Sequence, residues 1–409
     1  MHILLLTDNF PPENNAPAIR CYEHAREWVA LGQRVTVITC FPNFPAGRLF
    51  PGYRQRLFSR ETITGIDVIR VPTFIFQNSG TMLRLIDFMS FMVVGTLASL
   101  FVRRPDVVLA TSPQFFTAVA GWWVSCLRRC PFVFELRDLW PDSVIAVGAM
   151  RESRAMRMVR GLEELLYERA TAIVALTHSF KRILSSRGVN GEKVHVIPNG
   201  AASEMFEAGD IPDGLLANLK ISGCFVVSYI GTIGLAHDID IVLEAADMLA
   251  VSCPTVRIII VGNGAERDRL KSIVGSKGIW NISFIDSVPH EQIINYWRIS
   301  DATMVLLRDV PLFATVLPSK IFEAMATGTP IISNVQGEAK DLLLSSGAAE
   351  LIMPADGKAL ADAIASLASS PDHCRRLAQR GRETALKYAR PILARQVLSV
   401  LESTQVRNP

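Results

Sequence analysis

The chain has 409 residues, of which 49% are hydrophobic and 20% are charged. This composition allows large buried cores and excludes a disordered chain, and the length predicts two domains. Forty-two Lys and Arg residues against 39 Asp and Glu leave a net charge of +3, which disfavours a general nucleic-acid binder, because such proteins usually carry a basic stripe. Seven scattered cysteines predict reduced thiols in a cytoplasmic protein rather than a disulfide framework.

The first half of the chain alternates short apolar runs with segments of helical length. We predict strands at residues 2–7, 34–40, 107–110, 132–134, 172–176 and 194–197. The first run lacks a basic start and is too short for a cleavable signal, so it indicates a buried strand. The alternation is typical of a parallel sheet covered by helices on both faces.

A second series of strands is expected at residues 225–230, 256–261, 282–285, 302–307, 330–333 and 350–352. A polar stretch from Ile197 to about Gly223 separates the two series and predicts a linker. We therefore expect two doubly wound, Rossmann-like α/β domains, residues 1–198 and 199–390, facing each other across a cleft. Apolar positions at helical spacing after Pro391 predict a final helix, within residues 391–409, that crosses back onto the first domain.

Residues 85–102 form an apolar run that only Asp87 interrupts, flanked by Arg84, Arg103 and Arg104. At about 1.5 Å per residue it would barely match a hydrocarbon core of about 30 Å, and a span here would cut an α/β domain in half. A buried helix and a helix lying partly in the membrane interface are the other two interpretations. We expect a peripheral protein.

Glycine-rich strand ends are the first candidate sites, because ligands in open α/β sheets bind beyond the carboxyl ends of strands. Gly262 and Gly264 close one strand, but Arg267 stands where a dinucleotide fingerprint has its third glycine. The loop after residue 230 carries two more glycines and a histidine: Gly231, Gly234 and His237. Each loop is either a tight structural turn or a surface on which a nucleotide diphosphate can lie.

Residues 317–330 are the most informative segment. Pro318 and Ser319 suit a helix start and Gly328 suits its end. Lys320 would then lie in the first turn, where the helix end and the ammonium both favour an anion. Glu323 shares that face, and a carboxylate can accept hydrogen bonds from the hydroxyls of a ribose. The pattern indicates either a bound nucleoside diphosphate or a surface ion pair.

Two strand-end segments of the first domain are also candidates. Residues 7–18 form a long polar loop that contains Asn14 and Asn15 and leads into a helix. Four charged residues follow or end the strand at 132–134: Glu135, Arg137, Asp138 and Asp142. Charges at such a place are costly unless they pair with one another or serve a ligand.

With these residues, the chain resembles bacterial glycosyltransferases of family 4, which are retaining enzymes of the GT-B fold that use nucleotide sugars. The resemblance covers nearly the whole length: residues 10–12, 197–200 and 262–264 and the helix with Lys320 and Glu323 that ends at Gly328. The first loop together with residues 137–142 resembles the subgroup that builds O-antigen and capsule repeat units, including N-acetyl-L-fucosamine transferases.

The resemblance implies roles for particular residues. Lys320 would bind the diphosphate, Glu323 the ribose, and Asp138 would face the acceptor and the reacting sugar; these are the expected catalytic positions. The donor-binding residues that it implies are Gly231, Thr232, Gly234, His237, Gly262, Gly264, Ser319, Lys320 and Glu323. The acceptor-side residues that it implies are Asn14, Asn15, Arg137 and Asp138.

The sequence also departs from the family pattern. Thr315 replaces the first of two glutamates that family members commonly carry, which fits a deoxy or N-acetylated sugar. Thr232 and His237 stand where a basic pair is often found, so phosphate neutralisation would depend more on Lys320 and helix N-termini. Arg137 replaces a histidine of many relatives, and no general base is assigned there.

The expected function is transfer of a sugar from a UDP-sugar to an undecaprenyl-diphosphate-linked saccharide, by front-face displacement, at the inner face of the bacterial inner membrane. No cofactor or metal ion is expected, because no Asp-x-Asp stands at a strand end and the pair Asp238 and Asp240 falls inside a predicted helix. A nucleotide-sugar epimerase of similar fold, a dinucleotide oxidoreductase and a non-catalytic binding protein are the alternatives.

Overall fold

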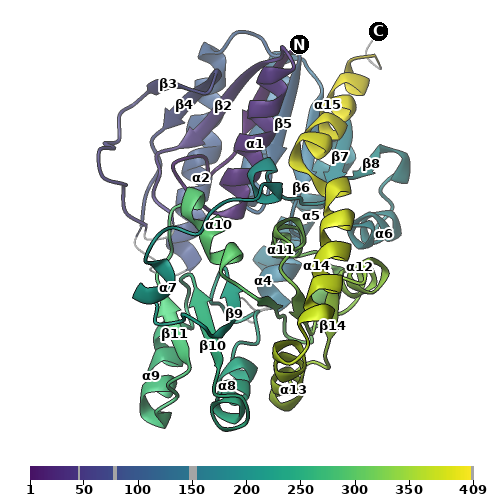
Figure 1. Ribbon diagram of the computed structural model, residues 1–409. Helices are drawn as coiled ribbons and strands as arrows, with labels where there is room; N and C mark the ends of the chain where they lie inside the picture. Colours follow the sequence, from purple (N-terminus) through teal and green to yellow (C-terminus); the bar gives the residue numbers. More distant parts are fainter. Residues whose placement is uncertain (45–46, 77–80, 147–153, 407–409) are drawn as a thin grey trace. The chain divides into compact units, whose positions relative to one another are not determined.

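The computed structural model describes residues 1–44, 47–76, 81–146 and 154–406 (Figure 1). The chain divides into two compact units: unit 1 comprises Met1–Pro198 and Arg390–Pro409, and unit 2 comprises Asn199–Ala389. Each unit contains one sheet with helices on both faces, and the strands are mostly parallel.

The described residues of unit 1 form an eight-stranded sheet in the order β3-β4-β2-β1-β5-β6-β7-β8. Neighbouring strands are parallel except β3 and β4. The strands are β1 His2–Leu6, β2 Arg34–Cys40, β3 Ser59–Ile63, β4 Ile66–Val71, β5 Val107–Thr111, β6 Phe132–Leu136, β7 Ala172–Ala175 and β8 Val194–Val196. The six strands that the apolar runs predict are all present.

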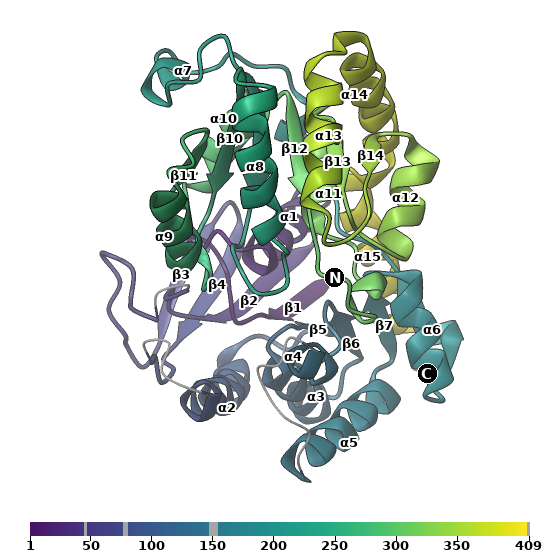
Figure 2. The same ribbon diagram turned by 90° about the horizontal axis from the view of Figure 1, so that it is seen from below.

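Helices cover both faces of this sheet. They are α1 Ala16–Ala30, α2 Thr81–Ala98, α3 Phe115–Arg128, α4 Asp142–Ala146, α5 Arg154–Arg169, α6 His178–Ser186 and α15 Arg390–Val406, with the 3-10 turns η1 Ser99–Phe101 and η2 Gly191–Lys193. Alternate strand residues point to opposite faces: Leu5 packs with Trp28 of α1 and Leu401 of α15. On the other face, α3 packs closely on β5, because a Cβ added at Gly121 would lie only 2.5 Å from the Cβ of Ala110. The helix α2 lies beside α3 on this face (Figure 2).

The strands β3 and β4 form an edge hairpin that the sequence analysis does not include. Thr64 and Gly65 connect them with φ angles of 47° and 82°, the left-handed conformations that a two-residue hairpin turn requires. Residues of β3 alternate between half-buried and exposed. A strand at the edge of a sheet lacks the continuous apolar run that identifies the buried central strands, which is why the sequence did not reveal it.

The last helix, α15, packs on unit 1 beside α1, as expected. Nε1 of Trp28 donates a hydrogen bond to the carbonyl of Ala394 (2.8 Å), and Arg390 forms a buried ion pair with Glu23. Val397 is fully buried in the same core. The end of the chain therefore completes the core of the unit in which it begins.

Unit 2, described throughout except for one side chain, has a six-stranded parallel sheet in the order β11-β10-β9-β12-β13-β14. The strands are β9 Phe225–Ile230, β10 Val256–Val261, β11 Ile282–Ile285, β12 Ala302–Val305, β13 Ile331–Ser333 and β14 Ala349–Leu351. The helices are α7 Leu215–Asn218, α8 Asp240–Ser252, α9 Arg267–Lys277, α10 His290–Arg298, α11 Ser319–Thr327, α12 Glu338–Ser346, α13 Gly357–Ala368 and α14 Pro371–Ala385, with η3 Ser203–Phe206, η4 Phe313–Thr315 and η5 Leu386–Tyr388. Trp297 of α10 and Phe322 of α11 pack on one face of this sheet, and Leu243 of α8 and Ile364 of α13 pack on the other.

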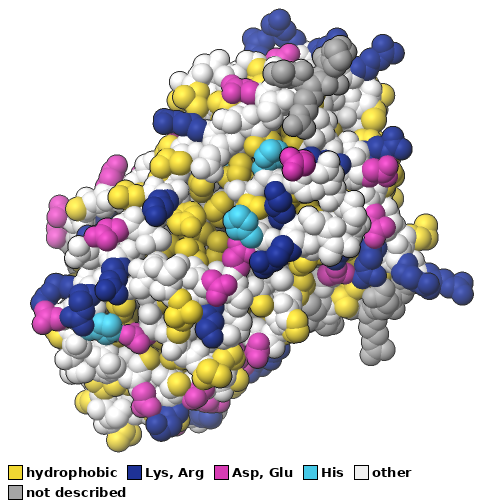
Figure 3. All heavy atoms as spheres, turned by 90° about the vertical axis from the view of Figure 1, so that its right-hand side faces the viewer, with side chains coloured by type: hydrophobic (Ala, Val, Ile, Leu, Met, Phe, Trp, Pro, Cys, Tyr) yellow, Lys and Arg dark blue, Asp and Glu magenta, His cyan; other side chains and the backbone are white. Residues whose placement is uncertain are grey.

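The apolar run at 85–102 is helical: α2 continues into η1. Within the described ranges, no helix combines the length and the apolar character that a bilayer span requires. All seven cysteines are unpaired. On the face shown in Figure 3, basic and acidic side chains are intermixed, in keeping with the small net charge.

Candidate active site

Gly262 and Gly264 follow β10, and the other candidate residues of unit 2 follow the carboxyl ends of β9 and β12. These strands are neighbours, but the chain continues from β9 towards β10 and from β12 towards β13, on opposite sides. Such a divergence opens a crevice where ligands bind in α/β sheets. A Cβ at Gly231, directly after β9, would lie 3.2 Å from Nζ of Lys320. The structure therefore brings the glycine loop and the start of α11 together.

Lys320 lies in the first turn of α11, which begins at Ser319 and ends before Gly328, as predicted. Pro318 offers no side-chain acceptor at the N-cap, so the first N–H groups of the helix lack a side-chain cap. Nζ of Lys320 is buried and has no hydrogen-bond partner among the described residues. It lies 4.0 Å from the centre of the Tyr229 ring, a cation–π contact. The other interpretation of this segment, a surface ion pair between Lys320 and Glu323, does not fit a buried ammonium that has no hydrogen-bond partner in the described part of the chain.

Burial sets the charge states in this crevice. It lowers the pKa of Lys320 to about 8, and the negative charge of Glu323 opposes that shift. Burial and the charge of Lys320 lower the pKa of His237 to about 3. At neutral pH the lysine is therefore mostly charged and the histidine is neutral. A buried ammonium without a hydrogen-bond partner is electrostatically costly, and an anion bound beside it would remove that cost.

Other donor-side candidates lie nearby in the same elements. The carbonyl of Thr232 accepts a hydrogen bond from the Tyr229 hydroxyl (2.6 Å), which ties the loop to the Tyr229 side chain. Ser319 and Glu323 are half-buried on α11. Thr315, at the position of the missing glutamate, lies in η4 and donates its hydroxyl to a neighbouring carbonyl (2.7 Å).

Gly262 and Gly264 are required by the contact between two loops. A Cβ at Gly262 would lie 2.0 Å from the carbonyl oxygen of Gly231, and one at Gly264 would lie 2.1 Å from that of Ile233. The Ile233 N–H donates to the carbonyl of Asn263 (2.9 Å). Close backbone approach explains both glycines, and their contact with a nucleoside stays a prediction.

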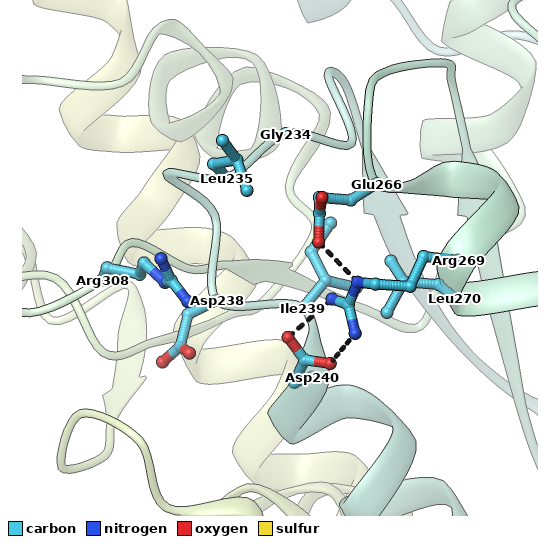
Figure 4. Close-up of a pocket in the computed structure, with 9 residues that line it drawn as sticks. All are labelled: Gly234, Leu235, Asp238, Ile239, Asp240, Glu266, Arg269, Leu270 and Arg308. Carbon is cyan, nitrogen blue, oxygen red and sulfur yellow. Dashed lines mark hydrogen bonds and ion pairs between the residues drawn. The ribbon is translucent and has the colours of Figure 1, made fainter. Parts of the chain in front are cut away.

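A pocket beside the loop has nine lining residues (Figure 4): Gly234, Leu235, Asp238, Ile239, Asp240, Glu266, Arg269, Leu270 and Arg308. Arg269 already pairs there with Asp240 (2.9 Å) and Glu266 (2.7 Å). Lys320 and Glu323 do not line this pocket. We therefore place the candidate site at Lys320 rather than in the pocket.

The sequence analysis missed Arg308, an exposed cation next to the same loop. Its N–H donates to the carbonyl of Ala236 (2.9 Å), and its charge counteracts the effect of burial, which raises the pKa of Asp238. Its position directly after a predicted strand is the signal that could have identified it. Asp238 has a φ of 45° and precedes α8, which begins at Asp240, so the prediction that both lie inside a helix is wrong for Asp238.

In unit 1, Glu135 in β6 and Asp142 at the start of α4 pair with arginines from other elements. Glu135 accepts a hydrogen bond from Nε of Arg20 in α1 (2.9 Å), and both side chains are buried. Asp142 pairs with Arg187 of the α6 end (2.6 Å). Nε and Nη1 of Arg137 are buried without a hydrogen-bond partner among the described residues, so of the two interpretations, pairing with a carboxylate or contact with a ligand, the structure does not support the first for these two nitrogens. The partners are distant in sequence, which is why spacing could not identify them.

Arg137 and Asp138 lie at the carboxyl end of β6. The Arg137 N–H donates to Oγ of Ser112 (2.7 Å) after β5, whereas its Nε and Nη1 are buried without partners in the described ranges. Burial lowers the pKa of Arg137 to about 10, so it stays charged at neutral pH. Asp138 accepts a hydrogen bond from Ser143 (2.8 Å), and burial raises its pKa. Unit 1 thus presents a second buried cation at strand ends.

The polar loop after β1 is held in place by Glu13. Its Oε1 accepts a hydrogen bond from the Asn43 N–H (2.8 Å). Asn14 is exposed, whereas Asn15 is the N-cap of α1: its Oδ1 accepts from the Ala18 N–H (2.9 Å). Asn15 therefore has a structural role besides any contact with an acceptor.

We expect Asn15→Ala to lower the free energy of unfolding by about 1 kcal/mol, because the cap hydrogen bond is lost. Asn15→Asp keeps an acceptor and should retain most of that energy. Asn14→Ala is the matched control and should change stability by less than about 0.5 kcal/mol. Thermal unfolding of the three variants tests this; equal effects of the two alanine substitutions would contradict the capping role.

Within the described residues, no group of three or more His, Cys, Asp and Glu side chains could hold a metal ion. Both units instead present groups that can bind an anion. Unit 2 presents Lys320 and the uncapped N–H groups of α11, and unit 1 presents the guanidinium of Arg137.

Comparison with known proteins identifies both halves of the chain. Residues 15–200 match the family described as Glycosyl transferase 4-like domain, and residues 217–384 match Glycosyl transferases group 1. The chain belongs to the group 1 glycosyltransferases. This glycosyltransferase is 24% identical over 336 residues to WcaI of Escherichia coli K12, which is assigned as a colanic acid biosynthesis glycosyl transferase; the alignment covers 80% of this chain and 82% of WcaI.

Solved structures show that the glycosyltransferase has the GT-B fold. Sucrose-phosphate synthase of Thermosynechococcus elongatus superposes with a TM-score of 0.76 at 18% identity, covering 98% of both chains. HepE of Anabaena, in complex with UDP and glucose, superposes with a TM-score of 0.73 at 18% identity, covering 98% of this chain and all of HepE (100%). At this identity the likeness establishes the fold and leaves the substrates to be argued from the site.

Proposed function

We propose that this glycosyltransferase moves a sugar from a UDP-sugar to a lipid-diphosphate-linked saccharide, with retention of configuration at the anomeric carbon. The observation that carries the donor half is the buried Nζ of Lys320, which has no hydrogen-bond partner among the described residues, in the uncapped first turn of α11. A diphosphate there would neutralise the ammonium and accept hydrogen bonds from backbone N–H groups. The UDP and glucose bound to HepE support a uridine nucleotide.

The donor would lie along α11 and the two glycine loops. Glu323, one turn after Lys320, accepts hydrogen bonds from the ribose hydroxyls. The loop residues Gly231, Thr232, Gly234 and His237 approach the phosphates and the sugar, Ser319 lies at the helix start, and Gly262 and Gly264 flank the nucleoside. Thr315 fits a donor with fewer hydroxyls, such as N-acetyl-L-fucosamine, because a threonine cannot accept the two hydrogen bonds of a carboxylate at that place.

The reaction is a front-face displacement. The bond between the anomeric carbon and the diphosphate oxygen breaks, and the acceptor hydroxyl oxygen bonds to the same face of that carbon. The acceptor proton passes to the leaving diphosphate oxygen, so that UDP departs. Lys320 and the first N–H groups of α11 stabilise the negative charge that develops on the diphosphate.

The acceptor would bind to unit 1. Arg137 has the charge and the unpaired nitrogens to bind a phosphate oxygen of the acceptor's diphosphate, and Asp138, Asn14 and Asn15 would face its sugar. The assignment of WcaI to colanic acid biosynthesis supports a polysaccharide repeat unit as the product. We place the enzyme on the cytoplasmic face of the inner membrane, where such lipid carriers are extended, and expect it to need no metal ion.

The first experiment is transfer and hydrolysis across a panel of nucleotide sugars. The panel contains UDP-N-acetylhexosamines, UDP-N-acetyl-L-fucosamine and GDP-sugars, each with and without a lipid-diphosphate-linked sugar and with added chelator. We expect release of UDP that depends on the acceptor, persists with chelator and is lost in Lys320→Met. Nuclear magnetic resonance of the product gives the anomeric configuration.

Other outcomes of the panel would replace the proposal. Conversion of the donor sugar without acceptor would indicate an epimerase. Binding of UDP-sugar without any turnover would indicate a binding protein, and an absence of nucleotide binding would remove the donor site at Lys320.

A further inference from the structure

The helix α2 exposes a stripe of large apolar side chains. Ile86, Met89, Val93 and Leu97 are all exposed, and their spacing of three or four residues places them on one side of the helix. Phe101 in η1 continues the stripe and has 80% of its surface exposed. Because the opposite side of α2 packs on the sheet, the stripe points away from the core.

Two neighbouring segments extend this surface. The helix α3 covers the same sheet face beside α2 (Figure 2) and exposes Trp123 and Leu127. The exposed Phe74 is tied to α2, because its N–H donates to Oγ of Ser90 (3.1 Å). We name the following residues the α2–α3 apolar face: Phe74, Ile86, Met89, Val93, Leu97, Leu100, Phe101, Trp123 and Leu127.

Apart from Asp87, the charge on these two helices lies at their ends. Asp87 is the only charged residue between 85 and 102, and residues 115–127 carry none. Four arginines gather where both helices end. Arg104 donates to the carbonyls of Arg128 and Arg129, and Arg128 donates to that of Val102. Arg103, Arg104 and Arg129 are exposed, so a basic rim borders the α2–α3 apolar face.

We propose that the α2–α3 apolar face docks on the surface of an anionic lipid bilayer, with α2 in the plane of the membrane. The stripe from residue 86 to 101 is about 22 Å long, the length of an in-plane amphipathic helix rather than of a span. Uncharged side chains would enter the boundary between headgroups and acyl chains, while the arginine rim meets anionic headgroups. This charge complementarity favours lipid over a second copy of the chain, in which two arginine rims would repel or face apolar residues.

This surface deepens the membrane location proposed above, since it would bring unit 1 to the bilayer in which a lipid-linked acceptor resides. It does not depend on the identity of the donor. Docking is therefore measured without sugar nucleotide or acceptor, and UDP binding is measured separately, so the two proposals can fail independently.

The test is cosedimentation of the full-length protein with vesicles of phosphatidylcholine containing 30% phosphatidylglycerol, or of phosphatidylcholine alone. We expect binding that is strongest to the anionic vesicles and weakens with salt. Leu97→Glu with Phe101→Glu should lower the partition coefficient by at least tenfold. Arg103→Gln and Arg129→Gln should each lower it about fivefold, on anionic vesicles alone.

Matched controls come from unit 2. Met248 and Val251 of α8 are also exposed apolar residues, and their replacement by Glu should leave vesicle binding unchanged. Quenching of tryptophan fluorescence by brominated lipids should disappear in Trp123→Phe and persist in Trp280→Phe, since Trp280 is exposed elsewhere and stacks on Arg257. An unchanged thermal midpoint and circular dichroism spectrum show that each variant is folded.

Two results would overturn the proposal. One is vesicle binding that survives Leu97→Glu with Phe101→Glu, which would move the lipid contact elsewhere. The other is a dimer in sedimentation velocity that the same double variant converts to a monomer, with no vesicle binding by the unmodified protein; the face would then be an interface between copies of the chain.

Discussion

Lys320→Met is expected to lower the rate of sugar transfer by about 100- to 1000-fold, the usual effect of removing one preorganised charge-stabilising group from a reaction centre. The thermal midpoint should stay the same or rise, because the substitution removes a buried ammonium that has no hydrogen-bond partner among the described residues. Loss of turnover without loss of stability indicates a residue that binds a ligand rather than one that holds the fold together. Steady-state kinetics and thermal unfolding measure the two effects.

The matched control is Lys271→Met in α9. Lys271 also lies over an aromatic ring, that of Phe284 at 5.9 Å, but it is exposed. The Lys271→Met substitution should therefore change neither the rate of sugar transfer nor the thermal midpoint appreciably. If Lys320→Met unfolds the protein, or if both variants lose the same activity, Lys320 has a structural role and the donor site lies elsewhere.

The pKa of Lys320 also predicts a pH dependence of nucleotide binding. The value of about 8 in the unliganded protein lies below that of an unfolded lysine, about 10.4. Only the ammonium attracts a diphosphate, so the affinity for UDP should fall as pH rises above about 8, by up to tenfold per pH unit. The same shift means that the burial of the ammonium costs stability below about pH 8, and this cost falls as pH rises from about 8 to 10.4. Calorimetric titration with UDP tests the first effect, and Lys320→Met should abolish it.

The sequence could predict the elements whose signals are local. The strands β9, β10 and β11 have the bounds that their apolar runs indicate, and α11 begins at Ser319 and ends before Gly328 because proline, serine and glycine act on their own backbone. The edge strand β3 carries no such run. Its pairing with β4 depends on a hairpin turn and on the neighbouring strand β2.

The site could be predicted only in outline. Spacing placed Lys320 and Glu323 on one helix face, but the burial of the ammonium depends on Tyr229 and Gly231, which come from another strand end. The glycines of the second loop likewise owe their identity to the carbonyls of the first. Long-range contacts of this kind decide whether a charge is exposed or buried, and a sequence pattern does not contain them.

Unlike the ammonium of Lys320, the buried side chains of Arg20 and Glu135 pair with each other, and this pair is expected to stabilise the fold. Glu135→Gln should destabilise unit 1 by about 3–5 kcal/mol. Glu135 is the buried carboxylate whose charge acts on both Arg20 and Arg137. Glutamine keeps the shape and removes the charge, so two buried guanidinium groups lose their counter-charge. For a domain of this size the thermal midpoint should fall by about 6–20 °C.

The matched controls separate this effect from a general cost of losing a carboxylate. Asp362→Asn breaks an exposed pair with Lys358 and should leave the thermal midpoint almost unchanged, because exposed ion pairs contribute little to stability. Arg137→Met should leave stability unchanged or raise it, because Glu135 keeps its hydrogen bond to Arg20. A mild effect of Glu135→Gln, equal to that of Asp362→Asn, would contradict the role of Glu135 as the shared counter-charge.

The same carboxylate predicts how unit 1 responds to acid. Burial alone would raise the pKa of Glu135, but the charges of Arg20 and Arg137 outweigh burial and lower it below the ordinary value. A carboxylate with a lowered pKa in the folded state contributes stability that is complete above the unfolded value of about 4.3 and is lost as pH falls through the folded value. Plotted against pH from about 7 down to about 3, the free energies of unfolding of the unmodified protein and of Glu135→Gln should therefore approach each other towards the acid end. Curves that stay parallel would mean that the lost stability comes from altered packing rather than from the charge.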